Sequence, residues 1–382
     1  MNQYKITTFI FLLILTTVSM ATIILNRNEL IEAIKSNNII EKMNTIYSTN
    51  VAFSKKFLSF WSMTQESLGT EILDDAEYGQ IIKDHTGNLY FPSHDVDVSP
   101  YAQNVIRFSQ LLKEKKIPFT YIQAPNKIVE GYTDKVVYQY NFSNQNADEF
   151  LNMLNESGVT TLDLRERILK SGIPKEELFY KTDHHWTTPT AFWAFQNIVK
   201  HLNQQFQLNI DEEYTKQENY QSIKKENCFL GSLGRRVGRE VAGLDDYVLI
   251  TPQFDTDYEI VDGSKGQVIA LGDFQSAIII DNILNSNDVE ANKHATYFEW
   301  DYGDLIIKNH IVNNELKVLL VKDSYALPVG AFLSTCVKEL HMVDLRDTPH
   351  VHLKEYIENN HFDAVVVLYN TEVFNDTMFQ FK

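Results

Sequence analysis

The sequence predicts an α/β fold in which a parallel sheet is flanked by helices and interrupted by a β-rich insertion. Residues 101–163 and 317–370 each alternate helical and strand-like segments, which is typical of a parallel sheet with crossover helices. Between them, from 203 to 314, Gly, Asn and Asp are frequent and the apolar runs are short. We therefore expect two pieces of one α/β domain, 76–202 and 315–382, on either side of an insertion at 203–314.

The N-terminal part is expected to contact a membrane. Ile6–Leu25 is an uncharged run preceded by Lys5, and about 20 such residues can just span a bilayer. Ser19-Met20-Ala21 offers a cleavage site, but the apolar run continues beyond it, so residues 1–28 are predicted to be an uncleaved signal-anchor. The alternative is a cleaved signal peptide and a secreted protein. Residues 29–75 follow as a helical stalk, and either way the bulk of the chain lies outside the cytoplasmic membrane.

The first piece of the α/β domain begins with a hairpin turn at Asp84–Phe91. Apolar periodicity then predicts helices and strands in alternation. The expected elements are a helix at 101–116, a strand at 119–124, a helix at 148–157 and a strand at 159–163.

Asp183, His184 and His185 follow, with Trp186 next to them, in the stretch Lys181–Trp193. A histidine can take and return a proton near neutral pH, and it does so best when a carboxylate orients its ring. The apolar run 191–199 predicts a helix, with Thr187 or Thr188 as N-cap and Pro189 in its first turn. The Asp and His therefore lie on a loop ahead of a buried helix. The alternatives are polar groups that cap this helix, or a metal site; we expect no metal, because the two histidines are adjacent rather than spaced along one helix face.

The insertion contains a Gly-rich, Arg-bearing stretch, Phe229–Gly238. It could bind an anion through Arg235, or it could be a surface turn with solvated arginines. It lacks the Gly-Lys-Ser/Thr ending of a phosphate loop, so we do not expect it to bind a nucleotide.

The second piece of the domain repeats the α/β alternation. The expected elements are a buried strand at 317–325 that ends in a polar turn, a helix at 329–338, a strand at 340–345, a helix at 351–359 and a strand at 362–370. Ser324, Arg346 and Asn370 stand at the ends of these three strands. Ligands of an open parallel sheet bind beyond the carboxyl ends of the strands. We therefore expect Ser324 to offer its backbone N–H to an oxyanion, with Asn370 as a second donor.

Composition excludes some classes of function. The formal charge of the 382 residues is −17 and no basic run could hold phosphates, so nucleic acid is not an expected partner. The 19 Tyr and 23 Phe are core residues or line a sugar-binding groove. Cys228 and Cys336 are a single disulfide or two free thiols.

The motif TDHHWTT, with KDSYA further along the chain, resembles the DHHW family of bacterial exported proteins. That family is similar to the acetyltransferase domains of the alginate O-acetylation proteins, which belong to the SGNH hydrolase superfamily. The resemblance covers roughly residues 75–375 and implies a permuted order of the superfamily's parts. The strands before Ser324, Arg346 and Asn370 match its first, second and third strands, and the strands and Asp–His loop that normally come last here come first. Arg346 stands where the superfamily has an oxyanion glycine.

By this resemblance, Asp183, His185 and Ser324 form a catalytic triad, Asn370 is an oxyanion donor and His184 is structural. The candidate substrate-binding residues are Arg346, Tyr325, Trp186 and Arg235. Arg346 either pairs with Asp323 or Asp347 or faces an acyl carbonyl or acidic sugar.

The resemblance implies an O-acyltransferase, more specifically an O-acetyltransferase, that modifies a surface or exported polysaccharide. It implies a membrane-bound O-acyltransferase as the partner that delivers the acyl group, and no cofactor. The alternatives are a carbohydrate esterase with the same triad, or a non-catalytic glycan-binding or assembly protein.

Overall fold

The computed structural model describes residues 3–36, 38–75, 79–129, 133–299, 302–348 and 352–381. The chain divides into two compact units, Met1–Thr70 and Glu71–Lys382. The expected domain boundary at residue 76, and the expected start of a helix at residue 351, lie outside the described residues.

The first unit is helical. Its elements are α1 (Gln3–Leu25), α2 (Arg27–Ile34), α3 (Ile39–Thr49) and α4 (Ser54–Ser67). Within α1, Tyr4–Leu25 is long and apolar enough to cross a membrane, a test that a signal sequence also passes. The predicted apolar N-terminal helix is therefore confirmed.

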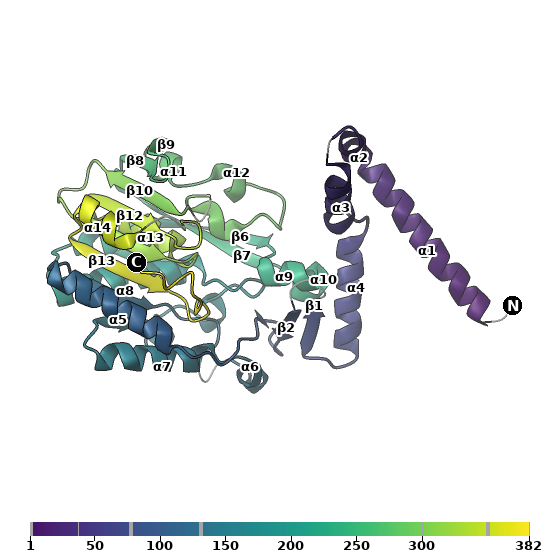
Figure 1. The fold of residues 1–382 in the computed structure, drawn as a ribbon, viewed down its shortest axis with the longest axis horizontal. Helices are drawn as coiled ribbons and strands as arrows, with labels where there is room; N and C mark the ends of the chain where they lie inside the picture. Colours follow the sequence, from purple (N-terminus) through teal and green to yellow (C-terminus); the bar gives the residue numbers. More distant parts are fainter. Residues whose placement is uncertain are drawn as a thin grey trace. The chain divides into compact units, whose positions relative to one another are not determined.

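The second unit is built on an eight-stranded sheet with the order β5-β4-β13-β11-β12-β10-β8-β9 (Figure 1). The neighbours β5, β4, β13, β11 and β12 run parallel, whereas β10, β8 and β9 extend the sheet with antiparallel pairings. The parallel strands are β4 (Phe119–Gln123), β5 (Thr161–Asp163), β11 (Lys317–Lys322), β12 (Glu339–Val343) and β13 (Ala364–Tyr369). The order β12-β11-β13-β4-β5 corresponds to the 2-1-3-4-5 order of doubly wound sheets, with β11 in the place of the first strand. The predicted mostly parallel sheet is therefore confirmed.

Helices cover both faces of this sheet. Alternate residues of β11 point to opposite faces: Val318 and Leu320 pack in one core with α8 (Thr188–Phe206) and α13 (Ala326–Leu333). Leu319 and Val321 pack in the other core with α5 (Ser99–Glu114), α7 (Ser143–Glu156) and α14 (Leu353–Asn360). The result is a layered α/β/α arrangement. Polar residues such as Ser324 and Asn370 follow the carboxyl ends of the buried strands.

The segment expected as an insertion contributes most of its strands to this same sheet. These strands are β8 (Tyr258–Asp262), β9 (Gln267–Gly272) and β10 (Asp304–Asn309). A separate pair, β6 (Tyr220–Phe229) and β7 (Asp245–Pro252), is antiparallel. Short helices lie between the strands: α9 (Ser232–Val237), α10 (Arg239–Ala242), α11 (Phe274–Ala277) and α12 (Asp281–Leu284).

Some element boundaries differ from the expected ones. The helix expected at 329–338 is α13, which begins at Ala326, directly after the Asp-Ser-Tyr turn, and ends at Leu333. The expected hairpin is confirmed between β2 (Gly79–Lys83) and β3 (Leu89–Tyr90), and β1 (Ile72–Asp75) completes this small sheet. The short helix α6 (Lys135–Tyr140) was not expected. Both cysteines are free thiols.

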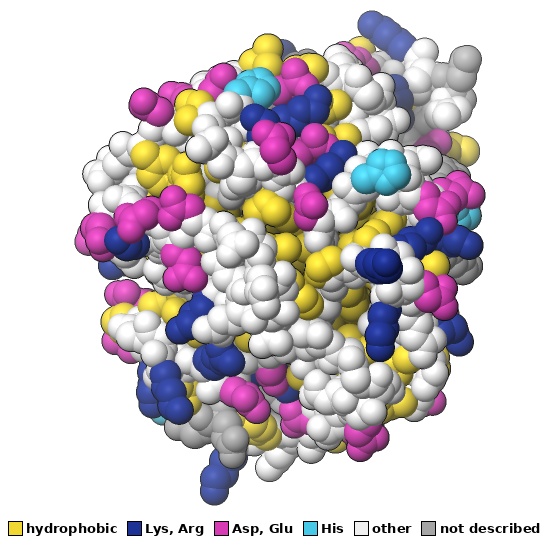
Figure 2. Space-filling model, turned by 90° about the vertical axis from the view of Figure 1, so that its left-hand side faces the viewer, with side chains coloured by type: hydrophobic (Ala, Val, Ile, Leu, Met, Phe, Trp, Pro, Cys, Tyr) yellow, Lys and Arg dark blue, Asp and Glu magenta, His cyan; other side chains and the backbone are white. Residues whose placement is uncertain are grey.

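Figure 2 shows the face of the molecule that lies to the left in Figure 1. Basic and acidic side chains are interspersed there around an area with apolar side chains, and among the residues coloured on this face no basic patch gathers. The surplus of acidic residues in the sequence is consistent with this mixture.

Candidate active site

The loop from Thr182 to Thr187 leads into α8, as the sequence predicts. Thr187 has the extended backbone of an N-cap and Pro189 lies in the first turn of the helix. The Thr187 hydroxyl donates to the Glu177 carbonyl rather than capping α8. Asp183 and His185 therefore lie on a loop that directly precedes α8.

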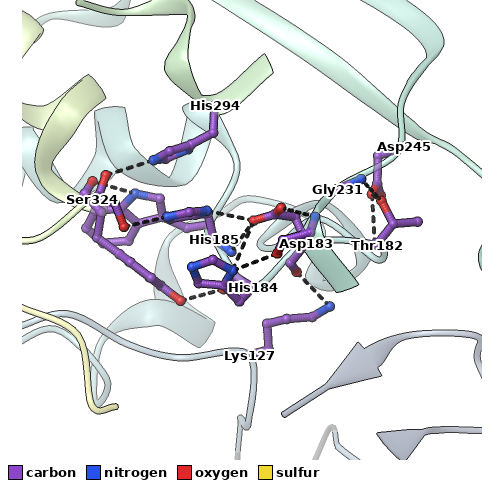
Figure 3. A network of polar contacts seen from close by, with 12 residues as sticks. Lys127, Thr182, Asp183, His184, His185, Gly231, Asp245, His294 and Ser324 are labelled. Atoms are coloured by element: carbon purple, nitrogen blue, oxygen red, sulfur yellow. Dashed lines mark hydrogen bonds and ion pairs between the residues drawn. The ribbon is translucent and has the colours of Figure 1, made fainter. Parts of the chain in front are cut away.

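Ser324, His185 and Asp183 form a continuous chain of hydrogen bonds (Figure 3). Nε2 of His185 lies 2.7 Å from the Ser324 hydroxyl oxygen, and Nδ1 lies 2.6 Å from a carboxylate oxygen of Asp183. Because the carboxylate only accepts, Nδ1 carries the hydrogen and Nε2 is left to accept from the serine. His185 and Asp183 are buried and Ser324 is partly exposed, so the serine hydroxyl is the member of the chain that a substrate can reach.

The electrostatics of the site keep His185 neutral and Asp183 ionised. Burial lowers the pKa of His185 well below its ordinary value of 6.5, and the rings of His184 and His294 lower it further. Burial acts to raise the pKa of Asp183, but the two neighbouring histidines and the hydrogen bonds from His185 and Ser232 outweigh it and hold that pKa well below its usual range. A neutral imidazole beside a carboxylate is the state in which a general base works.

Groups from distant parts of the chain hold the Asp183 loop in place. The ammonium of buried Lys127 donates to the carbonyls of Leu89, Lys181 and Asp183 at 2.7, 2.9 and 3.1 Å. Burial lowers the pKa of Lys127 to about 8. The backbone of the loop is thus tied to the strand β3 and to the turn after β4.

Two further contacts come from the β6–β7 region. The carboxylate of Asp245, on β7, accepts from the backbone N–H groups of Lys181 and Thr182 and from the Thr182 hydroxyl. The backbone N–H of Ser232, at the start of α9, donates to Asp183 at 2.7 Å. The anion that the Gly-rich stretch contacts in this structure is therefore the carboxylate of the triad itself.

Asp323 organises the turn that carries Ser324. One carboxylate oxygen accepts from Tyr325 N–H at 2.9 Å, and the other accepts from the backbone and side-chain N–H of Asn370 at 2.7 and 2.8 Å. Burial raises the pKa of Asp323 to about 6. The carboxylate joins the ends of β11 and β13. The Asn370 amide has a second N–H, and within the described part of the chain the Ser324 N–H has no protein acceptor.

Tyr325 and Trp186, expected to contact the substrate, are instead buried beneath the triad. Trp186 is 0% exposed and its indole N–H donates to the Tyr325 carbonyl at 3.0 Å. The Tyr325 hydroxyl donates to the carbonyl of His184, on the same loop as Trp186. The two residues bind the Asp–His loop to the serine turn, and they offer no surface to a ligand in this structure.

The two arginines also have protein partners. Arg346 forms a bidentate contact with buried Asp344, which also accepts from buried Lys322; the sequence did not indicate Asp344 as a partner. The Arg346 backbone N–H donates to Asp344 as well, so it is not directed at an oxyanion. Arg235 donates to the carbonyls of Leu230 and Glu290. Arg346 remains 41% exposed and so accessible from solvent.

Sequence patterns did not indicate several of these supporting residues: Lys127, Asp245, Asp344 and His294. Each is an isolated polar residue in a segment without a motif, and it reaches the site only through the folding of the chain. His294 is buried, stacks on His185 and lies 2.8 Å from the Ser324 carbonyl oxygen.

Donor atoms of Asp183, His184 and His185 lie within 4.8 Å of one another, close enough to share a metal ion. Their hydrogen bonds are those of a proton-transfer chain, however: Nδ1 and Nε2 of His185 face Asp183 and Ser324, and Nδ1 of His184 lies 3.0 Å from the Ser232 hydroxyl. These contacts let the Ser324–His185–Asp183 chain transfer a proton without a metal ion.

The sequence and the fold both have known counterparts. Residues 89–246 match the family model described as the SGNH hydrolase-like domain of the acetyltransferase AlgX. The structure of PatB1 from Bacillus cereus is 23% identical, with a TM-score of 0.66 over 79% of this chain and 99% of that one. The structure of the same protein with a sulfonyl adduct is 22% identical, with a TM-score of 0.65 over 79% of this chain and 97% of that one. A DHHW family protein from Eubacterium siraeum is 17% identical, with a TM-score of 0.58 over 78% of this chain and 93% of that one. No curated protein matches the chain in sequence.

The family match over residues 89–246 indicates an enzyme with an SGNH hydrolase-like domain of the acetyltransferase type, and the similar structures share its fold. The resemblance to the DHHW and alginate O-acetyltransferase domains that the sequence motifs indicate is confirmed. At these identities the similar structures establish the fold alone.

Proposed function

We propose that this protein is an extracytoplasmic O-acetyltransferase that modifies a cell-surface or exported polysaccharide through an acyl-serine intermediate. The observation that carries the proposal is the Ser324–His185–Asp183 chain, with contacts of 2.7 and 2.6 Å and a partly exposed Ser324. The apolar helix α1 supports placement at a membrane. The resemblance to the alginate O-acetylation proteins implies a membrane-bound O-acyltransferase as the partner that supplies the acyl group.

In the first half of the reaction, Ser324 Oγ attacks the carbonyl carbon of the acyl donor while its proton passes to Nε2 of His185. Asp183 accepts the hydrogen bond from Nδ1 and stabilises the imidazolium. The Ser324 N–H and the second N–H of the Asn370 amide donate to the oxyanion of the tetrahedral intermediate. When that intermediate collapses, the bond to the leaving group breaks, the leaving group takes the proton from His185, and Ser324 holds the acyl group.

In the second half, a sugar hydroxyl loses its proton to Nε2 of His185 and attacks the acyl-serine carbonyl. The bond to Ser324 Oγ then breaks, the proton returns to the serine, and the sugar leaves as an ester. If water takes the place of the sugar, the same groups hydrolyse the ester.

Transfer and hydrolysis are separated by incubating the protein with an activated acetyl ester, with and without oligosaccharide acceptors, and measuring O-acetylated glycan and free acetate. A transferase gives acetylated glycan at the expense of acetate. Acetate as the sole product with every acceptor would identify an esterase. Absence of both products, with a phosphonate that fails to label Ser324, would favour a non-catalytic glycan-binding protein.

Ser324→Ala tests the nucleophile. A loss of about 10⁴-fold or more in rate is expected for removal of a triad serine. Ser276→Ala, at an exposed position on α11, is the matched control and should retain activity. A folded Ser324→Ala protein with near-normal transfer would remove Ser324 from the mechanism.

A further inference from the structure

His294 contacts both partners of the proposed proton transfer. It lies in the short 3₁₀ helix η5 (Lys293–Thr296), between β9 and β10, and is 4% exposed. Its ring stacks on that of His185, with centroids 3.7 Å apart and planes 12° from parallel. Its Nε2 lies 2.8 Å from the carbonyl oxygen of Ser324. Because a carbonyl only accepts, this nitrogen carries a hydrogen and donates it.

The hydrogen bond from His294 strengthens the restraint of one peptide unit. The Ser324 carbonyl and the Tyr325 N–H belong to the same planar peptide group. Asp323 accepts from the N–H at 2.9 Å, and the carbonyl accepts from His294 at 2.8 Å and, over a longer contact of 3.3 Å, from the Leu327 N–H. With both ends held, the plane is fixed, and with it the direction in which the Ser324 side chain leaves the backbone.

The stacking contact restrains the other partner. The edges of the His185 ring are held by Asp183 and Ser324, and its faces are covered by two histidines. The His184 ring lies 3.8 Å away, tilted by 37°, and Figure 3 shows it on the side of His185 opposite to His294. The ring therefore has little freedom to rotate away from the serine.

We propose that His294 is a positioning residue, which aligns Ser324 Oγ with Nε2 of His185 by holding the Ser324 peptide and the His185 ring at the same time. The inference rests on the triad of the proposed function. In this role the His294 ring takes no part in the proton transfer. It acts on the reacting atoms only through its contacts with Ser324 and His185. A misplacement of about 1 Å between reacting groups can cost about 10²-fold in rate.

The test uses two variants that separate the two contacts. His294→Phe keeps a flat ring for stacking but loses the donor, and His294→Gln keeps a donor but loses the stack. We expect His294→Phe to lower kcat by about 10²-fold with KM little changed. His294→Gln should recover a substantial part of that loss, since it can restore the bond to the Ser324 carbonyl.

Lys293→Met is the matched control for loosening the segment. The Lys293 ammonium donates to the carbonyls of Ile283, Leu284 and Ser286, away from the triad. It should lower the melting temperature while kcat stays near that of the unchanged protein.

The results distinguish a failure of this inference from a failure of the proposed function. The inference is overturned if both His294 variants keep kcat within about 3-fold while Ser324→Ala is inactive. It is overturned too if Lys293→Met loses kcat to the same degree as His294→Phe at equal melting temperature, because the effect would then be structural. If Ser324→Ala itself retains transfer, the proposed function fails and His294 has no triad to position.

Discussion

At the scale of single residues, the site depends on which of two adjacent histidines faces the serine. His185 Nε2 contacts Ser324, whereas His184 Nδ1 lies 3.0 Å from the Ser232 hydroxyl and 3.5 Å from Asp183. The sequence placed both beside Asp183, and a resemblance to known motifs favoured His185. The geometry supports the same choice, because only the second histidine lies between the carboxylate and the serine.

His185→Ala is therefore expected to be about as damaging as loss of the serine, since the members of a triad act as one unit. His184→Ala should lower the rate less, because it removes a ring that packs against His185 but leaves the base itself in place. Steady-state kinetics of both variants, with melting temperatures measured in parallel, test this order. If His184→Ala proves the more damaging, the base has been assigned to the wrong histidine.

The pH dependence of the reaction follows from the environment of the same ring. Burial and the neighbouring histidines lower the pKa of His185 below 6.5. A base is active when unprotonated, so activity should be retained as the pH falls through 6.5 and lost only as it passes the lowered pKa. The acid limb of the kcat/KM profile reports this value for the free enzyme. An acid limb at or above pH 6.5 would show that the ring is not the buried, neutral base described here.

At the scale of elements, the sequence predicts the strands and helices better than the contacts between them. Short apolar runs located β4, β11, β12 and β13, because each of these strands is buried on both faces. The expected start of this helix, residue 329, lies three residues after the observed start of α13 at Ala326. No capping residue in the sequence marks the point where the Asp-Ser-Tyr turn ends and the helix begins.

The supports of the site could not be predicted in this way. Asp245 and Gly231 have no local pattern that refers to Asp183, and they come near it only because β6, β7 and α9 fold against the loop. The Gly-rich stretch did carry a signal for an anion, but the sequence could not say that the anion is an aspartate of the same chain. The contact itself is a consequence of the tertiary fold.

Gly231→Ala tests the packing of α9 on the loop. A Cβ at this position would lie 2.3 Å from Cβ of Asp183 and 2.7 Å from its Cα, so the loop must shift. We expect the rate to fall by about 10²-fold as Asp183 moves out of line with His185. Kinetics and melting temperature are measured together.

Gly263→Ala provides the control, because its Cβ would lie 2.3 Å from another aspartate, here from the carboxylate of Asp304 on β10. Both variants collide with a buried aspartate, but only Gly231 lies against the triad. Gly263→Ala should lower the melting temperature with little change in kcat. Equal losses of kcat in both variants would mean that the rate reports general destabilisation rather than the position of Asp183.

At the scale of the whole molecule, the division of the chain separates two tasks. Glu71–Lys382 contains every residue of the proposed triad, and Met1–Thr70 contains the apolar helix. Side-chain hydroxyls of Thr8, Thr16 and Thr17 within α1 donate to carbonyls one turn earlier, so these polar groups are satisfied without water. That arrangement is compatible with a bilayer, where unsatisfied polar groups are costly.

We therefore expect the full chain to sediment with membranes and to be released by detergent but not by high salt. A chain of residues 71–382 should remain in the soluble fraction and label with a serine-reactive phosphonate as the full chain does, because its core lies within that unit. Mass spectrometry of the mature N-terminus distinguishes the two forms of attachment. An intact apolar segment supports the signal-anchor, since a single span of about 20 residues is enough to hold the protein. A new N-terminus after Ala21 would instead show a cleaved signal peptide, and a full chain that washes off in salt would show that α1 does not cross the membrane at all.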